Sequence, residues 1–91
     1  MHWTWDETKA AINLHKHGVS FELAALALDS DPGMLSALDS HPDADRWDTL
    51  AVIGTTMLYI MHTWPNHDQE SGRIISARRA SSKEKVRYEN G

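Results

Sequence analysis

Residues 72–91 read GRIISARRASSKEKVRYENG, a β-branched run followed by a short polar segment. The run predicts a strand over residues 73–77, because β-branched side chains suit a pleated sheet. A serine at position 81 or 82 can cap a final helix that extends to about Glu89. The segment therefore adds one strand and one helix to the fold, and the elements before it determine which sheet they join.

Charge is distributed unevenly along the chain. Residues 72–91 hold six of the nine Lys and Arg residues against two Glu, a net charge of +4. Residues 1–71 hold three basic and eleven acidic residues, a net charge of −8. Salt screens fields beyond roughly 10 Å at 0.1 M ionic strength, so a basic edge can attract phosphate locally even in an acidic chain. The C-terminal segment is the first candidate for a nucleic-acid surface.

Length and composition predict a single domain over residues 1–91. The apolar content of 41 % is enough for a folded core, and the lack of cysteine excludes disulfides and thiolate metal sites. We expect a cytoplasmic protein without a cofactor. We also expect no membrane contact, because the N-terminus lacks signal-peptide features and the apolar run at residues 57–61 is too short to span a bilayer.

Two helices are predicted near the N-terminus, over residues 7–17 and 21–28, after a short strand over residues 2–5. The residues expected to cap them are Asp6, Gly18 and Ser20. Apolar side chains recur at helical spacing in the second helix, at Phe21, Ala24, Ala25 and Leu28. This stripe predicts the helix face that packs on a sheet.

Four further strands are predicted over residues 34–39, 46–53, 57–63 and 73–77. Strands joined by short turns pair antiparallel. The expected fold is therefore α+β, with two N-terminal helices packed on an antiparallel sheet of about four to five strands and a short C-terminal helix. Val86 is the one strongly apolar side chain expected to anchor that last helix.

Three strings of the sequence resemble a known family. They are WDE at residues 5–7 with Lys9 and Asn13, KHGVSFE at residues 16–22, and RIISARRA at residues 73–80 followed by Glu84 and Tyr88. Together they closely resemble the BrnT family of type II toxins, and the resemblance covers nearly the whole chain. It implies a RelE-like fold and an endoribonuclease that cleaves messenger RNA without a metal and arrests growth.

The resemblance also implies a partner, a BrnA-like antitoxin with a ribbon-helix-helix DNA-binding part. It implies a toxin homodimer within the complex, which would reach operator DNA only through the antitoxin. One stretch departs from the family, whose members often carry an Arg just after the fourth strand, whereas residues 63–67 read TWPNH. The alternative is therefore a catalytically weakened subunit that acts through antitoxin binding and operon co-repression.

Metal-free RNA cleavage needs a base, an acid and cations that stabilise the charged phosphorane. Arg73, Arg78 and Arg79 are candidates for the cations, because guanidinium groups bind phosphate bidentately. On a regular strand, Arg73 and Arg79 point to one face and Arg78 to the other. The alternative for all three is a solvated, salt-bridged edge.

The other candidate site residues also have structural alternatives. His17 can act as acid or base and Lys16 can contact phosphate, or both can complement the C-terminal helix dipole. Glu22 can accept a proton or stabilise a helix start, and Arg46 can face RNA or pair with the Asp-rich segment beside it. Tyr88 can stack on a base, hydrogen-bond the site or pack in the fold.

The hypothesis assigns two sets of residues. The predicted catalytic residues are His17, Glu22, Arg46, Arg73 and Arg78, and the predicted RNA-binding residues are Lys16, Arg79 and Tyr88. No metal site is predicted, because His15 and His17 lie two apart on a helix and point to different faces. The four Trp residues are expected mainly in the core, with Trp64 the best candidate for base stacking.

Overall fold

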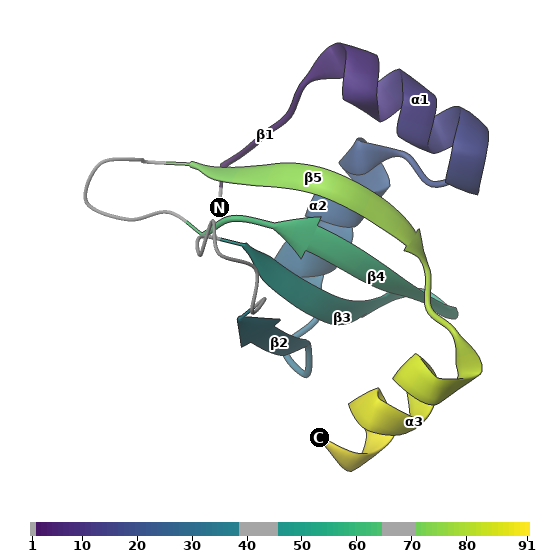
Figure 1. Cartoon of the computed structure of the whole chain (residues 1–91). Coiled ribbons are helices and arrows are strands. Elements are labelled where there is room, and N and C mark those ends of the chain that lie inside the picture. Colours follow the sequence, from purple (N-terminus) through teal and green to yellow (C-terminus); the bar gives the residue numbers. More distant parts are fainter. Residues whose placement is uncertain (1, 39–45, 65–70) are drawn as a thin grey trace.

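The computed structural model describes residues 2–38, 46–64 and 71–91, which form an α+β fold with a five-stranded sheet (Figure 1). The helices are α1 (Glu7–His17), α2 (Phe21–Ser30) and α3 (Ser82–Asn90). The strands are β1 (Trp3–Thr4), β2 (Leu35–Leu38), β3 (Trp47–Ile53), β4 (Thr56–His62) and β5 (Gly72–Arg79). The predicted fold class is confirmed.

The strands lie in the order β1-β5-β4-β3-β2. Strands β2 to β5 pair antiparallel with their neighbours, as their short connections predict. Strand β1 pairs parallel with β5, with Trp3 opposite Gly72, so the sheet is mixed rather than wholly antiparallel. Most of the chain lies between these two strands, and no local turn signal could therefore reveal their relative direction.

The predicted caps of the first two helices are confirmed. The Asp6 carboxylate accepts a hydrogen bond from the Lys9 N–H at 3.0 Å, and the Ser20 hydroxyl accepts one from the Leu23 N–H at 3.1 Å. Gly18 ends α1 with a φ of 70°, in the left-handed region that a side chain disfavours. Each N-cap is worth about 1 kcal/mol, so local sequence largely determines where these helices begin.

The main core lies between the sheet and the two N-terminal helices. Three residues of the predicted stripe on α2, Phe21, Ala24 and Leu28, are buried there. They pack against alternate strand residues, which are Ala51, Leu58, Ile60, Ile74 and Ala77. The indole of Trp3 closes one end of this core beside Gly72, where a side-chain Cβ would lie 2.2 Å from the ring. Gly72 is therefore required by the close approach of Trp3.

Helix α3 lies on the other face of the sheet and is attached mainly by polar contacts (Figure 1). Arg87 pairs with Asp48 at 3.1 Å. Val86 is 55 % exposed, so the prediction that it anchors this helix is wrong. The fully buried side chain on this face is Leu50 of β3, which alternates with the core residue Ala51 and so points away from α1 and α2.

No helix within the described ranges combines the length and apolar character needed to cross a bilayer.

Candidate functional site

A β-bulge in β5 decides which arginines share a face of the sheet. Met61 is paired with Ser76 but the next residue of β4, His62, is paired with Ile74, which leaves Ile75 as the extra residue. The bulge reverses the alternation of side chains along the strand. Arg73 therefore shares the α3-side face with Arg78, while Arg79 follows the buried Ala77 on the other face. The prediction that Arg73 and Arg79 point to the same face of the sheet is wrong for this reason.

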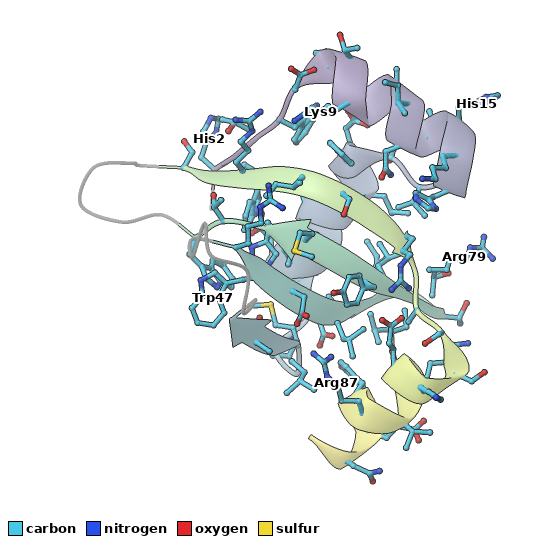
Figure 2. The ribbon with its side chains drawn as sticks, viewed as in Figure 1. His2, Lys9, His15, Trp47, Arg79 and Arg87 are labelled. Carbon is cyan, nitrogen blue, oxygen red and sulfur yellow. The ribbon has the colours of Figure 1, made fainter. Side chains whose placement is uncertain are left out.

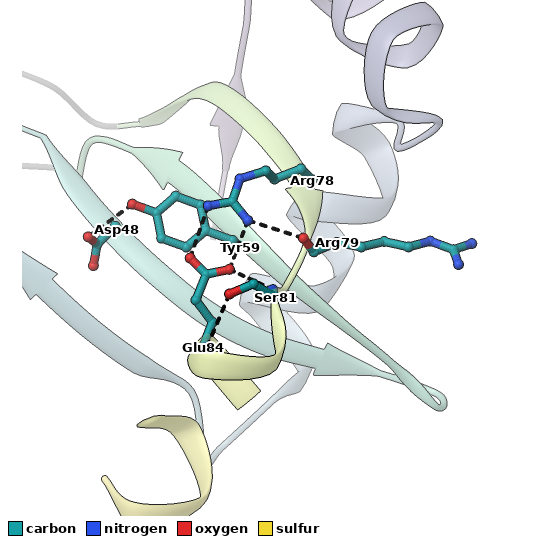
Figure 3. A network of polar contacts seen from close by, with 6 residues as sticks. All are labelled: Asp48, Tyr59, Arg78, Arg79, Ser81 and Glu84. Atoms are coloured by element: carbon teal, nitrogen blue, oxygen red, sulfur yellow. Dashed lines mark hydrogen bonds and ion pairs between the residues drawn. The ribbon is translucent and has the colours of Figure 1, made fainter. Parts of the chain in front are cut away.

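Arg78 is held by two side chains on the α3-side face (Figure 3). Its Nη1 and Nη2 atoms donate to the two carboxylate oxygens of Glu84 at 2.8 and 2.9 Å. Its guanidinium carbon lies 4.3 Å from the centroid of the Tyr59 ring, a cation–π contact. Nη1 also donates to the carbonyl oxygen of Arg79 at 3.2 Å. The Arg78 side chain nevertheless remains 40 % exposed.

One edge of the Arg78 guanidinium keeps its hydrogen-bonding capacity. Its contacts within the described ranges use both hydrogens of Nη1 and one of Nη2. The Nε–H and the second hydrogen of Nη2 have no partner there, and they lie along the same edge of the planar group. Two parallel N–H donors of this kind match two oxygens of a phosphate. Arg78 can thus bind Glu84 and a phosphate at the same time.

Three side chains of this network have shifted pKa values. The hydrogen bond from Arg78 is the main cause that lowers the pKa of Glu84 to about 2, and the same bond raises the pKa of Arg78. Burial is the main cause that raises the pKa of Tyr59 to about 12, and the negative charge of Asp48 adds to it. Glu84 is therefore an anion and Tyr59 a neutral phenol across the physiological pH range.

Asp48 extends this network toward the end of α3. It accepts a hydrogen bond from the Tyr59 hydroxyl at 3.1 Å and pairs with Arg87 through its other oxygen, also at 3.1 Å. Arg87 lies between the sheet and α3 in Figure 2, and it donates to Asp48. Tyr59 is therefore fixed at its hydroxyl as well as by its place in β4, and its ring gives Arg78 a stable support.

A shallow groove of about 230 Å³ runs between α1 and β5. The side chains that line it are Lys9, Ile12, Asn13, Lys16, His17, Ile75 and Ser76. Ser76 lies on the α3-side face of β5, two residues before Arg78. The fold thus brings the predicted Lys16 and His17 next to the strand that carries Arg73 and Arg78. Lys16 and His17 come from the N-terminal part of the chain and Arg73 and Arg78 from the C-terminal part, and we refer to these four residues as the cationic surface.

Asn13 fixes α1 against β5 and thereby positions this groove. It is buried, donates to the carbonyl oxygens of Val19 and Ala77 at 3.0 and 2.8 Å, and accepts from the Ala77 N–H at 3.2 Å. The Asn13 amide thus hydrogen-bonds both the N–H and the carbonyl of Ala77, as a neighbouring strand would otherwise do. A polar residue inside a helix was the available sequence signal for such a buried contact.

Glu22 and Arg46 lie apart from the cationic surface. Glu22 lines a different groove with Glu7 and Leu14, on the opposite flank of α1 from Lys9 and Lys16. Arg46 precedes β3 and is half-buried, at the same end of the sheet as Arg73 but two strands away. Glu22 is therefore not brought together with the other predicted catalytic side chains.

Arg79 and Tyr88 also differ from the expected arrangement. Arg79 is exposed and points away from the Arg78 contacts (Figures 2 and 3). The Tyr88 hydroxyl donates to Asp31 at 2.7 Å and so joins α3 to the turn before β2. Burial acts to raise the pKa of Asp31, but hydrogen bonds from Val52, Tyr88 and Gly33 together hold it below its usual value. Tyr88 therefore has a structural contact of its own, the hydrogen bond to Asp31.

His62 was not singled out from the sequence. It is fully buried, hydrogen-bonds with the Thr49 hydroxyl, and packs edge-on against Trp3 and Trp64 at ring-centroid distances of 5.3 and 4.7 Å. Burial is the main cause that lowers its pKa. These contacts place Trp3 and Trp64 in or against the core, as expected for most of the Trp residues.

Within the described ranges, no three His, Cys, Asp or Glu side chains gather closely enough to hold a metal ion.

The family model described as "Ribonuclease toxin, BrnT, of type II toxin-antitoxin system" matches residues 5–84. The matched region includes β5, both N-terminal helices and Glu84. The chain belongs to this family of ribonuclease toxins. No curated protein matches the chain significantly.

Proposed function

We propose that this protein is an endoribonuclease that cleaves messenger RNA without a metal ion and arrests growth. Membership of a ribonuclease toxin family supports RNA as the substrate. The observation that carries the proposal further is the Nε–Nη2 edge of Arg78, which has no partner within the described ranges. Arg78 is on the same face of β5 as Arg73 and two residues after Ser76, which lines the groove of Lys16 and His17. This face offers phosphate-binding cations and a titratable group to one RNA strand.

The chemistry proposed is attack of a ribose 2′-oxygen on the adjacent phosphorus, with loss of the 5′-oxygen. Arg78 binds two phosphate oxygens and stabilises the charge that develops on them. His17 takes the proton of the 2′-hydroxyl or gives one to the leaving 5′-oxygen, since imidazole can carry or release a proton near neutral pH, and solvent water makes the other transfer. Lys16 and Arg73 contact neighbouring phosphates. Arg46 would extend this contact toward β3, whereas Glu22 has no part in the step.

We further propose that a BrnA-like antitoxin with a ribbon-helix-helix part holds the enzyme inactive. A type II family has a protein antitoxin, which supports a partner of this general kind. In this proposal the toxin pairs as a homodimer within the complex and reaches operator DNA only through the antitoxin. Copurification of the two proteins, with the mass of the complex measured in solution, tests the partner and the stoichiometry together.

The test of the catalytic proposal compares two neighbouring arginines. Wild type, Arg78→Ala and Arg79→Ala are expressed in bacteria and purified, and each is incubated with RNA in the presence of EDTA. We expect growth arrest and RNA cleavage with wild type, and a loss of about 100-fold or more in cleavage with Arg78→Ala, as for removal of a transition-state donor. Arg79→Ala removes the same charge from the other face and should keep most activity.

The alternative function is a weakened subunit that acts only through antitoxin binding and co-repression. It is favoured by the bidentate pairing of Arg78 with Glu84 and by the lack of an Arg in residues 63–67. Under this alternative, wild type binds the antitoxin normally but neither cleaves RNA nor arrests growth. Equal RNA cleavage by wild type and Arg78→Ala would instead support a nuclease whose active site does not include Arg78.

A further inference from the structure

We propose that Glu84 is a positioning residue, which fixes the Arg78 guanidinium so that its Nε–Nη2 edge is aimed at the RNA phosphate. This inference rests on the proposed function and deepens it, because it adds α3 to the site. The helix contributes no catalytic residue of its own. It contributes the carboxylate that holds the catalytic cation in place.

The first support is the geometry of the pair. The two bonds of 2.8 and 2.9 Å join both oxygens of Glu84 to both terminal nitrogens of Arg78 (Figure 3). Such end-on pairing fixes the plane of the guanidinium as well as its position. Glu84 uses only the end of the group, so the Nε–Nη2 edge required for a phosphate remains available. A lysine at position 78 would offer a single nitrogen with no planar group for the carboxylate to orient.

The second support is that Glu84 is itself held. Its Oε1 atom accepts the Ser81 N–H at 2.7 Å, and its own N–H donates to the Ser81 hydroxyl at 3.3 Å, which is a complete capping box. Its side chain is only 16 % exposed. The carboxylate is therefore fixed to the first turn of α3 before any RNA arrives, and little conformational freedom is left to lose on binding.

The third support is the Tyr59 ring on the other side of Arg78. The ring is fixed by β4 and by the bond from its hydroxyl to Asp48. Arg78 is thus held in its plane by Glu84 and supported from one face by Tyr59 at 4.3 Å. A guanidinium needed only for fold stability would not require a free bidentate edge.

Positioning and charge neutralisation predict opposite effects. If Glu84 positions Arg78, loss of the carboxylate leaves the guanidinium free to rotate and slows cleavage. If Glu84 merely neutralises Arg78, loss of the carboxylate strengthens phosphate attraction and speeds cleavage. Glu84→Gln separates these views. Glutamine is also a normal capping-box residue, so the start of α3 is retained, while its NH₂ group cannot accept from Arg78.

The matched control is Arg87→Gln. It removes a second ion pair between α3 and the sheet, the contact with Asp48, without touching Arg78. We expect Glu84→Gln to lower kcat on the order of tenfold or more with a smaller change in KM, because misplacement of a catalytic group affects the transition state most. Arg87→Gln should keep both constants close to those of wild type. In an Arg78→Ala background, Glu84→Gln should have no further effect.

A measurement without RNA separates this inference from the proposed function. In the free protein, the Nη1 and Nη2 hydrogens of Arg78 that bond to Glu84 should give distinct, slowly exchanging NMR signals that Glu84→Gln abolishes and Arg87→Gln preserves. A wild type with this signal that does not cleave RNA would refute the proposed function, and the catalytic role of Glu84 with it. If wild type cleaves RNA and Glu84→Gln cleaves it equally fast or faster, the positioning role alone is refuted. Equal losses of kcat in Glu84→Gln and Arg87→Gln would refute it too.

Discussion

The two faces of the sheet carry different kinds of helix contact. On the face covered by α1 and α2, apolar side chains such as Phe21 and Leu58 form a continuous core. On the face that carries α3, no residue of the helix is buried, and the described contacts are mainly ion pairs and hydrogen bonds. Apolar burial is strong and nondirectional, whereas polar contacts add little net stability but fix geometry. The first face maintains the fold, and the second orients Arg78.

The largest expected effect comes from truncating one leucine on each face. Leu58 and Leu50 are both 0 % exposed, but only Leu58 belongs to the main core. We expect Leu58→Ala to lower the free energy of unfolding by about 3–5 kcal/mol, because the surrounding core cannot close the cavity. Leu50→Ala should lower it by roughly 2–3 kcal/mol, since α3 can shift toward the space.

Urea unfolding followed by circular dichroism measures both changes. Unchanged slopes of the unfolding free energy against urea would show that the two variants unfold in the same way as wild type. Equal losses at the two positions would contradict the comparison, because they would make the α3 face as tightly packed as the main core.

A smaller change in stability is expected when the pH is lowered, and the pH range of the change differs between the two faces of the sheet. Burial lowers the pKa of His62 from 6.5, so the unfolded chain binds its proton more readily than the folded protein does. His62 therefore stabilises the fold fully above pH 6.5, and this contribution decreases as the pH falls below that value. Glu84, with a pKa lowered from 4.5 to about 2, stabilises α3 above pH 4.5 and loses this contribution between pH 4.5 and about 2.

Unfolding free energies measured from pH 7.5 to 5 test this assignment. We expect His62→Gln to flatten the pH dependence just below pH 6.5, even if the variant is less stable at every pH. Glu84→Gln should leave the slope in that range as in wild type. An unchanged slope in His62→Gln would assign the titration to other groups.

The smallest expected effect is the loss of the α3 cap. Ser81→Ala removes the hydroxyl that accepts the Glu84 N–H, which should destabilise the helix by about 1 kcal/mol. Because no residue of α3 is buried, we expect local fraying rather than global unfolding. Amide hydrogen exchange should therefore become faster in α3 and stay unchanged in α2. Faster exchange in both helices would show that α3 and the main core open together.

Much of the fold could be predicted from the sequence, because its signals are local. Asp6, Gly18 and Ser20 mark helix ends through bonds that reach only three or four residues. The β-branched run of β5 and the helical stripe of α2 follow from the spacing of side chains alone. The parallel pairing of β1 with β5 could not be predicted in this way, since it joins residues about seventy positions apart.

The candidate site was predictable in its residue types but not in its arrangement. The string at residues 73–80 indicated a basic strand, and Lys16 and His17 indicated a second basic segment. The bulge at Ile75 then placed Arg73 with Arg78 and separated Arg79 from them. No single residue in the strand signals the bulge, because it arises from pairing with β4. Glu22 was predicted with this group and lies on the other flank of α1.

By itself the sequence determined the α+β class, the helix caps, the basic C-terminal segment and the family to which the chain belongs. Each of these depends on residue identity and short-range spacing, which a linear chain already contains. Only the tertiary structure decided that Glu84 and Tyr59 hold Arg78 and leave one guanidinium edge free. Those contacts depend on the register of β4 with β5 and on the direction of α3, which are set when separate elements pack together.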